Sequence, residues 1–167
     1  LELFARYGFA GGARTLGADS GRPTPVIERA GSSPPAVLLH GGLSQAGSWC
    51  LVAGRVPGRV VIPDRPGWGL SNQLDFRSVD MRESSVTWLR GVMDELELEN
   101  TTLVGASIGG FIALSYALAH PERVANIVLV GAPPGLRRQL PLRLMGNPIV
   151  GPLMARSKIT DPEVNRR

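Results

Sequence analysis

Short runs of apolar and β-branched residues alternate along this chain with longer stretches of helical periodicity. This alternation is typical of a parallel sheet, because each parallel connection needs a crossover segment that covers the sheet. The sequence therefore predicts an α/β domain, with a mostly parallel sheet and helices on both of its faces. The runs predicted as strands are 13–16, 25–30, 36–40, 59–63, 101–105 and 125–130.

The stretches between these strands have helical features of different strength. A short helix is expected within 44–56. Asp80, with Glu83 three residues later, is typical of a helix start, and apolar residues then recur at helical spacing as far as residue 96. Residues 111–119 are apolar on nearly every side, which predicts a helix that is buried all round.

Beyond residue 135 the alternation stops, and apolar residues are interrupted by prolines. We therefore divide the chain into an α/β core at 1–135 and the start of a helical insertion at 136–167. The end of the chain is basic, since 137–167 holds seven Arg or Lys residues against two acidic ones, in a chain of net charge +4. A nucleic-acid site would also contain aromatic residues, and this segment has none, so no nucleic-acid partner is expected.

The composition excludes further classes of protein. One cysteine and two histidines are too few for a zinc site of the usual Cys and His spacing. No apolar run approaches the roughly 18 to 20 residues that a membrane helix requires. The first residues lack the charged start and the apolar stretch of a signal peptide. We expect a cytoplasmic protein with no metal and no membrane partner.

The most informative motif is a serine among small residues, between a predicted strand and a predicted helix. Residues 105–110 read Gly-Ala-Ser-Ile-Gly-Gly, which fits the pattern G-x-S-x-G. A sharp turn holds such a serine in a strained backbone conformation, so that its hydroxyl projects. Strand and helix backbones crowd at this turn, and Gly105, Gly109 and Gly110 supply positions without a side chain. Ser107 is therefore predicted to be a nucleophile at a helix N-terminus, where free N–H groups favour negative charge.

A second group of small residues, His40, Gly41 and Gly42, ends the third predicted strand. Attack on an acyl carbon creates an oxyanion, which two preorganised N–H donors stabilise. We expect Ile108, the residue after the nucleophile, to supply one donor. Gly42 is expected to supply the other, with Leu43 as the alternative.

Five segments carry a resemblance to a known family by their order and spacing. They are VLLHGG at 37–42, PDRPGWGLS at 63–71, LVGASIGG at 103–110, ALAHPERV at 117–124 and IVLVGAP at 127–133. With these segments the chain resembles the α/β-hydrolase superfamily, in the branch that bears a cap and a serine nucleophile. The resemblance implies an α/β-hydrolase fold without a metal or an organic cofactor, and it implies that 136–167 begins the cap.

The same resemblance implies a catalytic acid and a histidine that follow the serine, on loops after later strands. This sequence ends before those strands. We therefore expect a fold truncated before its last strands, no catalytic acid or base in this chain, and negligible ester hydrolysis by this polypeptide alone. His120 is expected roughly 20 Å from Ser107 at the other end of one helix. In the family, the histidine at the position of His40 belongs to the framework of its loop.

Four other residues near the predicted strand ends have two interpretations each. Trp49 and Trp68 could line an acyl pocket or pack the edge of a core. Asp64 and Arg65 could be catalytic, but a structural ion pair or a turn anchor is the favoured interpretation.

The favoured function is hydrolysis of a carboxylic ester, or of a related acyl bond such as a lactone or thioester, through an acyl-enzyme on Ser107. The expected partner is a small apolar acyl substrate, and the sequence leaves the oligomeric state open. The resemblance also leaves cofactor-free haloperoxidases, carbon–carbon bond hydrolases and acyltransferases open, whereas dehalogenases and epoxide hydrolases would carry an aspartate at position 107. A non-catalytic relative used for binding is the main alternative. A dinucleotide-binding domain is a weaker one, because the spacing is not G-x-G-x-x-G and the next strand ends without an acidic residue.

Overall fold

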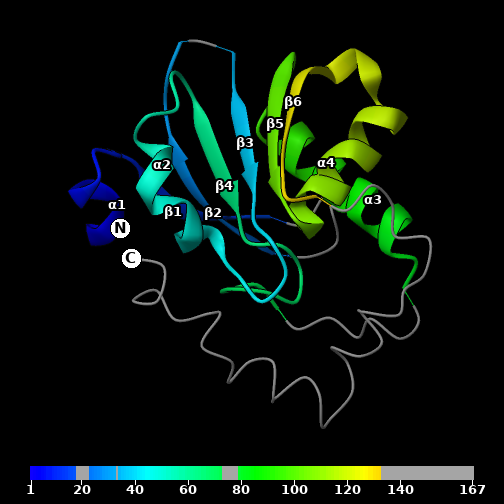
Figure 1. Cartoon of the computed structure of the whole chain (residues 1–167), viewed down its shortest axis with the longest axis horizontal. Coiled ribbons are helices and arrows are strands. Elements are labelled where there is room, and N and C mark those ends of the chain that lie inside the picture. The colour runs from blue at the N-terminus through cyan, green and yellow to red at the C-terminus, as the bar shows by residue number, and fades with distance from the viewer. Residues whose placement is uncertain (18–22, 33, 73–78, 133–167) are drawn as a thin grey trace, which may run out of the picture.

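The computed structural model describes residues 1–17, 23–32, 34–72 and 79–132 (Figure 1). The predicted helical insertion at 136–167 lies outside the described residues. The strands are β1 (Gly12–Leu16), β2 (Thr24–Arg29), β3 (Ala36–Leu39), β4 (Val60–Pro63), β5 (Thr101–Ala106) and β6 (Val124–Val130). The α-helices are α1 (Glu2–Arg6), α2 (Cys50–Ala53), α3 (Met81–Glu95) and α4 (Ile108–Ala119), with the 3₁₀ helices η1 (Ala46–Trp49) and η3 (Pro121–Arg123).

These strands form one six-stranded sheet in the order β1-β2-β4-β3-β5-β6. The pairs β1–β2 and β2–β4 are antiparallel, whereas β4, β3, β5 and β6 run parallel to one another. The predicted α/β fold with a mostly parallel sheet is therefore confirmed. The carboxyl ends of the parallel strands meet at one edge, the lower edge in Figure 1, and ligands of such sheets bind at that edge.

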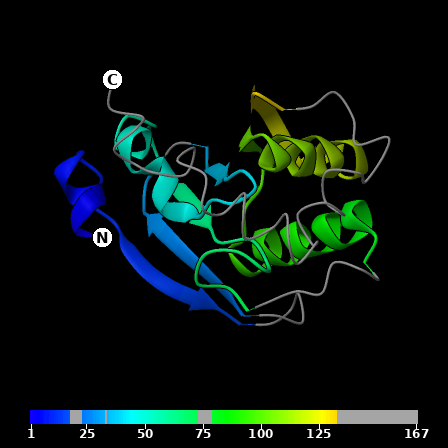
Figure 2. The same cartoon turned by 60° about the horizontal axis from the view of Figure 1, so that its bottom comes forward.

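Helices cover both faces of the sheet, as predicted. The alternating side chains of β3 point to opposite faces, so Val37 and Leu39 join one core and Ala36 and Leu38 join the other. The first core lies under α3 and α4, and the second lies under α1 and α2. Figure 2 shows α3 and α4 side by side, away from α1 and α2.

The predicted start of α3 is confirmed. The Asp80 carboxylate accepts hydrogen bonds from the N–H groups of Arg82 and Glu83, each at 2.9 Å. This caps donors that have no partner within the helix. The short helix α1 was not predicted, because its five residues are too few for a recognisable periodicity.

The expectation for 111–119 is wrong in one respect. The helix begins at Ile108, directly after Ser107, which agrees with the predicted place of Ser107 at a helix N-terminus. It is not buried all round: Ile112, Ala113 and Tyr116 face the core, while Leu118 is 66% exposed. An apolar composition permits burial on every side, but no described element covers the outer face.

Among the described strands, β6 is the last along the chain and forms one edge of the sheet. Its apolar residues Val128, Leu129 and Val130 are 47%, 46% and 52% exposed. By contrast, every residue of β3 and β4 is buried. No helix within the described ranges is both long and apolar enough to cross a bilayer.

Candidate active site

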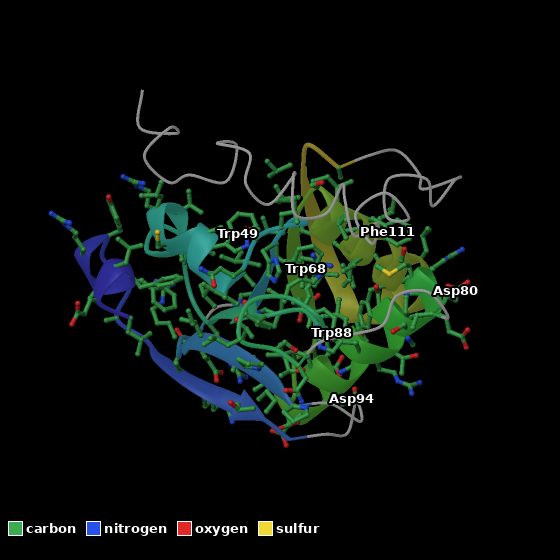
Figure 3. All side chains as sticks on the ribbon, turned by 90° about the horizontal axis from the view of Figure 1, so that it is seen from below. Trp49, Trp68, Asp80, Trp88, Asp94 and Phe111 are labelled. Carbon is green, nitrogen blue, oxygen red and sulfur yellow. The ribbon has the colours of Figure 1, made fainter. Side chains whose placement is uncertain are left out.

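Ser107 occupies the turn between β5 and α4, with φ 50° and ψ −116°. A positive φ is costly for a residue with a side chain, and such strain gathers at functional sites. Main-chain hydrogen bonds hold the turn: Ser107 N–H donates to the Val130 carbonyl at 2.9 Å, and the N–H groups of Gly110 and Phe111 donate to the Ser107 carbonyl. The serine is exposed at the carboxyl edge of the sheet, which Figure 3 views from below. This is the projecting geometry that the G-x-S-x-G pattern requires.

The glycines around Ser107 have no room for a side chain. A Cβ on Gly105 would lie 2.4 Å from the Gly109 carbonyl oxygen, and one on Gly109 would lie 2.1 Å from the Leu39 carbonyl oxygen. A Cβ on Gly110 would lie 2.4 Å from the Cβ of Ala132. These close approaches are the crowding of strand and helix that the sequence pattern predicts.

The loop after β3 lies against the serine. A Cβ on Gly41 would be 3.5 Å from both the Ser107 Cβ and the Ala106 carbonyl oxygen. Ile108 is the first residue of α4, so its N–H has no acceptor within the helix. Leu43 has a φ of 54°, which turns the loop sharply after Gly42. The structure therefore brings together the segments from which the two oxyanion donors were predicted, and the donor roles themselves stay predictions.

His40 uses both ring nitrogens within the fold. Its side chain is fully buried, Nδ1 lies 2.9 Å from the Gly41 carbonyl oxygen, and Nε2 accepts from the Arg65 N–H at 3.1 Å. These partners assign the proton to Nδ1. Burial, together with the nearby charge of Arg65, lowers the pKa of His40 to about 4. The imidazole is thus neutral near pH 7, its 3.8 Å contact with Asp64 is not an ion pair, and it has no nitrogen free to act as a base.

Asp64 anchors two loops at this edge. Its carboxylate accepts from the N–H of Ala46 at 2.7 Å and from the N–H of Leu70 at 2.9 Å. Gly69 has a φ of +61°, and a Cβ there would lie 2.3 Å from the same carboxylate. The buried Asp64 is therefore a turn anchor, which was the favoured interpretation of its sequence position.

Arg65 contacts the loop that follows β3. The residue is 2% exposed, and its Nη2 donates to the Gly41 carbonyl at 2.9 Å. Its guanidinium carbon lies 5.5 Å from the centre of the Trp68 ring, and its Nε has no acceptor among the described residues. Burial lowers the pKa of Arg65 to about 10, against the opposing effect of Asp64. The sequence marked Arg65 as structural, but its link to Gly41, 24 residues away, had no local signal.

The two tryptophans have different surroundings (Figure 3). Trp68 is half-buried beneath the Arg65 guanidinium. Trp49 packs against the core under α1 and α2, and its buried indole N–H has no acceptor among the described residues. Their predicted role in lining an acyl pocket stays a prediction.

His120 caps the opposite end of α4 from Ser107. The centre of its ring lies 4.9 Å from the centre of the Tyr116 ring, and its Nδ1 lies 3.7 Å from the Glu122 carboxylate. The helix between it and Ser107 has 12 residues, a length of about 18 Å. Within the described part of the chain, neither imidazole reaches the serine, and no three His, Cys, Asp or Glu side chains gather as a metal site would need.

Comparison with known proteins gives a consistent result. Residues 34–163 match the family model described as alpha/beta hydrolase fold. The 2-hydroxymuconate semialdehyde hydrolase of Pseudomonas sp. (strain CF600) is 38% identical over 128 residues, which are 74% of this chain and 41% of that protein. This chain thus spans about two fifths of the length of that relative.

Two solved structures have the same fold over most of this chain. The haloalkane dehalogenase DatA from Agrobacterium tumefaciens C58 has a TM-score of 0.69 at 26% identity, and the match covers 79% of this chain and 44% of that one. The carboxylesterase CesB from Bacillus subtilis has a TM-score of 0.65 at 26% identity, with 77% and 45% covered.

Proposed function

Because the chain belongs to the α/β-hydrolase fold family, we propose that it carries the nucleophile and the oxyanion-binding loops of a hydrolase that attacks acyl carbons through Ser107. The observation that supports this most is the exposed Ser107 on a turn of positive φ, with Gly41 packed against it. Backbone strain of this kind gathers at functional sites, so the conformation and the exposure of Ser107 together support a chemical task.

The reaction proceeds in two steps, acylation of Ser107 and hydrolysis of the acyl-enzyme. The Ser107 Oγ attacks the carbonyl carbon and its proton passes to a general base, while the Ile108 N–H and one amide of the loop after β3 bind the oxyanion. Collapse of this tetrahedral species breaks the bond to the alcohol, which takes up the proton. Water then attacks the acyl-enzyme in the same way, releasing the carboxylic acid and restoring the Ser107 hydroxyl.

This reaction needs a general base that the chain's own histidines do not supply. Both nitrogens of His40 are engaged, and His120 lies at the other end of α4. The proposal therefore assigns the acid and the base to residues outside the described part of the chain. Activity should accordingly be sought in the complete gene product.

The proposed substrate is a small apolar carboxylic ester, and the similarity to CesB, which is named as a carboxylesterase, supports this class. A second candidate is suggested by the relative that is 38% identical, whose name specifies 2-hydroxymuconate semialdehyde. Attack of Ser107 on the carbonyl of such a compound would form a tetrahedral species, and its collapse would break a carbon–carbon bond while the leaving carbon takes up a proton. Water would then release the acyl group as a carboxylic acid. Dehalogenation is not proposed, although DatA shares the fold, because position 107 is a serine.

A labelling experiment tests the nucleophile directly. The complete gene product is treated with a fluorophosphonate, which phosphonylates an activated serine and releases fluoride. We expect labelling at Ser107, none in Ser107→Ala, and full labelling in Ser48→Ala, where an exposed serine of η1 is removed. A folded wild-type protein that resists labelling would instead support the non-catalytic binding role.

The two substrate candidates are separated by parallel assays. A nitrophenyl butyrate and 2-hydroxymuconate semialdehyde are offered to the untreated complete gene product, with Ser107→Ala as the blank. Turnover of the nitrophenyl ester alone supports the ester proposal. Turnover of the semialdehyde at the higher kcat/KM would replace it with carbon–carbon bond hydrolysis.

A further inference from the structure

The Gly41 carbonyl oxygen is held by two buried side chains. Nδ1 of His40 lies 2.9 Å from this oxygen, and Nη2 of Arg65 donates to it at 2.9 Å. His40 is 0% exposed and Arg65 is 2% exposed, so the carbonyl is directed into the protein. The Arg65 backbone N–H also donates to His40 Nε2, so the three residues form one closed set of hydrogen bonds.

The direction of this carbonyl determines the direction of the next amide. The Gly41 carbonyl and the Gly42 N–H belong to one peptide unit, and the described chain has no cis peptide. In a planar trans peptide the C=O and N–H bonds point in opposite directions. A carbonyl directed toward His40 and Arg65 therefore turns the Gly42 N–H away from the interior.

The outward side of this peptide is the side of the nucleophile. A Cβ on Gly41 would be 3.5 Å from the Ser107 Cβ, so the loop and the serine are neighbours there. We propose that Arg65 is a positioning residue, which holds the Gly41 carbonyl so that the Gly42 N–H, and not that of Leu43, faces Ser107 as the second oxyanion donor. This inference rests on the proposed function for its catalytic consequence.

Arg65 suits this task better than a neutral donor would. A hydrogen bond from a guanidinium to a carbonyl is charge-assisted and stronger than a neutral one. The planar group is held against Trp68, and the neighbouring Asp64 fixes Ala46, which follows the loop after β3, and Leu70, in the loop after β4. The orientation of the 41–42 peptide is thus set before any substrate arrives, as electrostatic preorganisation requires.

Arg29 offers a matched control. It is also an arginine that lies over an aromatic ring, with its guanidinium carbon 5.2 Å from the centre of Phe9. It also donates to backbone carbonyls, among them that of Gly58. Those carbonyls lie at the end of α2 and in the loop that leads into β4, at the opposite end of the parallel strands from Ser107. Arg29→Met therefore measures what such an arginine contributes to folding alone.

The kinetic test compares Arg65→Met, Arg65→Lys and Arg29→Met in the complete gene product, with the substrate that Ser107 turns over. Loss of one oxyanion donor lowers kcat by about 10²–10³-fold. A misdirected donor should cost Arg65→Met about ten- to hundredfold in kcat, with KM nearly unchanged. A boronic acid that mimics the tetrahedral species should lose affinity by a similar factor. Arg65→Lys should recover part of the loss, and Arg29→Met should keep the wild-type kcat.

A purely structural role for Arg65 predicts a different result. Arg65→Met would then melt at a lower temperature, as Arg29→Met does, while its kcat and boronic acid affinity below that temperature stay at wild-type values. This result would overturn the proposal and leave Ser107 as the nucleophile.

A spectroscopic test does not depend on activity. In ¹⁵N–¹H spectra of the chain, Arg65→Met should shift the Gly42 amide strongly, because that amide shares a peptide with the carbonyl that loses its donor. The Leu43 amide should move less, and the Gly42 proton should exchange rapidly with solvent because it has no acceptor among the described residues. A Gly42 proton protected from exchange, or unmoved by Arg65→Met, would refute the assignment even if no substrate is found.

Discussion

The two sides of the Ser107 turn differ sharply in how they are packed. On the β3 side, Leu39 and His40 are fully buried, and hydrogen bonds from buried side chains hold the loop that follows. On the β6 side, the turn is joined to Val130 by one main-chain hydrogen bond, and that residue is 52% exposed. The comparison indicates that the precision of the site comes from the β3 side, where the oxyanion is expected.

The largest difference in stability between the two sides is expected when one methyl group is added to each, at Gly109 on the β3 side and at Gly110 on the β6 side. In Gly109→Ala the new Cβ would meet the backbone of β3 at 2.1 Å, which a buried strand cannot relieve. We expect a loss of about 3 kcal/mol in the free energy of unfolding, or failure to fold. In Gly110→Ala the closest atom is the Cβ of Ala132, beyond the end of β6, and a loss of about 1 kcal/mol is expected. Urea unfolding measures the free energy of unfolding of both variants. Equal losses in the two would contradict the proposed difference in packing between the β3 side and the β6 side.

Acid should affect the β3 side through His40. Its pKa falls from 6.5 to about 4 on folding, so between these pH values the imidazole is protonated in the unfolded chain and neutral in the folded chain. Stability is therefore unchanged above pH 6.5 and decreases as the pH falls toward 4, by about 3 kcal/mol in total. Most of this loss in the free energy of unfolding occurs above pH 4.5. The pKa of Glu28 is lowered, so that carboxyl stays ionised there and its titration does not obscure that of His40.

Urea unfolding at several pH values between 7 and 4 checks this prediction, and nuclear magnetic resonance of the imidazole nitrogens identifies the group. A His40 ring that becomes protonated near pH 6.5 in the folded protein would show that the loop after β3 is open to water. The contrast between the two sides would then be lost.

A pair of isosteric substitutions compares the strands away from the turn. Val61 of β4 is fully buried, so Val61→Thr places a hydroxyl in the core and should cost about 2 kcal/mol. Val128 of β6 is 47% exposed, and Val128→Thr should change stability by less than about 0.5 kcal/mol. Thermal or urea unfolding distinguishes the two, and a large loss at Val128 would mean that β6 is covered in solution.

The smallest effect on stability is expected for Val128→Lys, which should change the solution behaviour instead. An exposed apolar edge strand is a template for pairing with another chain, and a lysine there hinders such pairing. Light scattering of the chain across a concentration series should show less association for Val128→Lys than for wild type. Equal association of the two would exclude β6 as the contact.

The fold could be predicted from sequence to the extent that local signals determine it. All six strands were predicted to within one residue. For β3 to β6 the signal is a compact apolar run, for β1 and β2 it is the turn-rich segment 17–24 between them, and α3 was predicted because Asp80 is typical of a helix start. The outer face of α4 could not be predicted, since its composition does not say whether another element covers Leu118.

In the candidate site, too, the features set by local sequence could be predicted, and those made by contacts between distant residues could not. The turn at Ser107 is a local steric pattern, and its glycines are visible in the sequence. The set formed by His40, Gly41 and Arg65 joins residues 24 and 25 positions apart, and it exists only because β3 and β4 are paired. The position of Asp64 and Arg65 directly after a predicted strand indicated an anchor, but nothing in the local sequence identified Gly41 as the partner of Arg65.

The corner that presents Ser107 is defined entirely by main-chain atoms. Its amide bonds to Val130, its carbonyl accepts from Gly110 and Phe111, and its side chain makes no capping hydrogen bond. The backbone conformation of this turn is thus independent of the nucleophilic side chain, so a carboxylate could replace the hydroxyl without a change in the main chain. This independence gives a physical reason why a haloalkane dehalogenase and a carboxylesterase both have the same fold as this chain at 26% identity each.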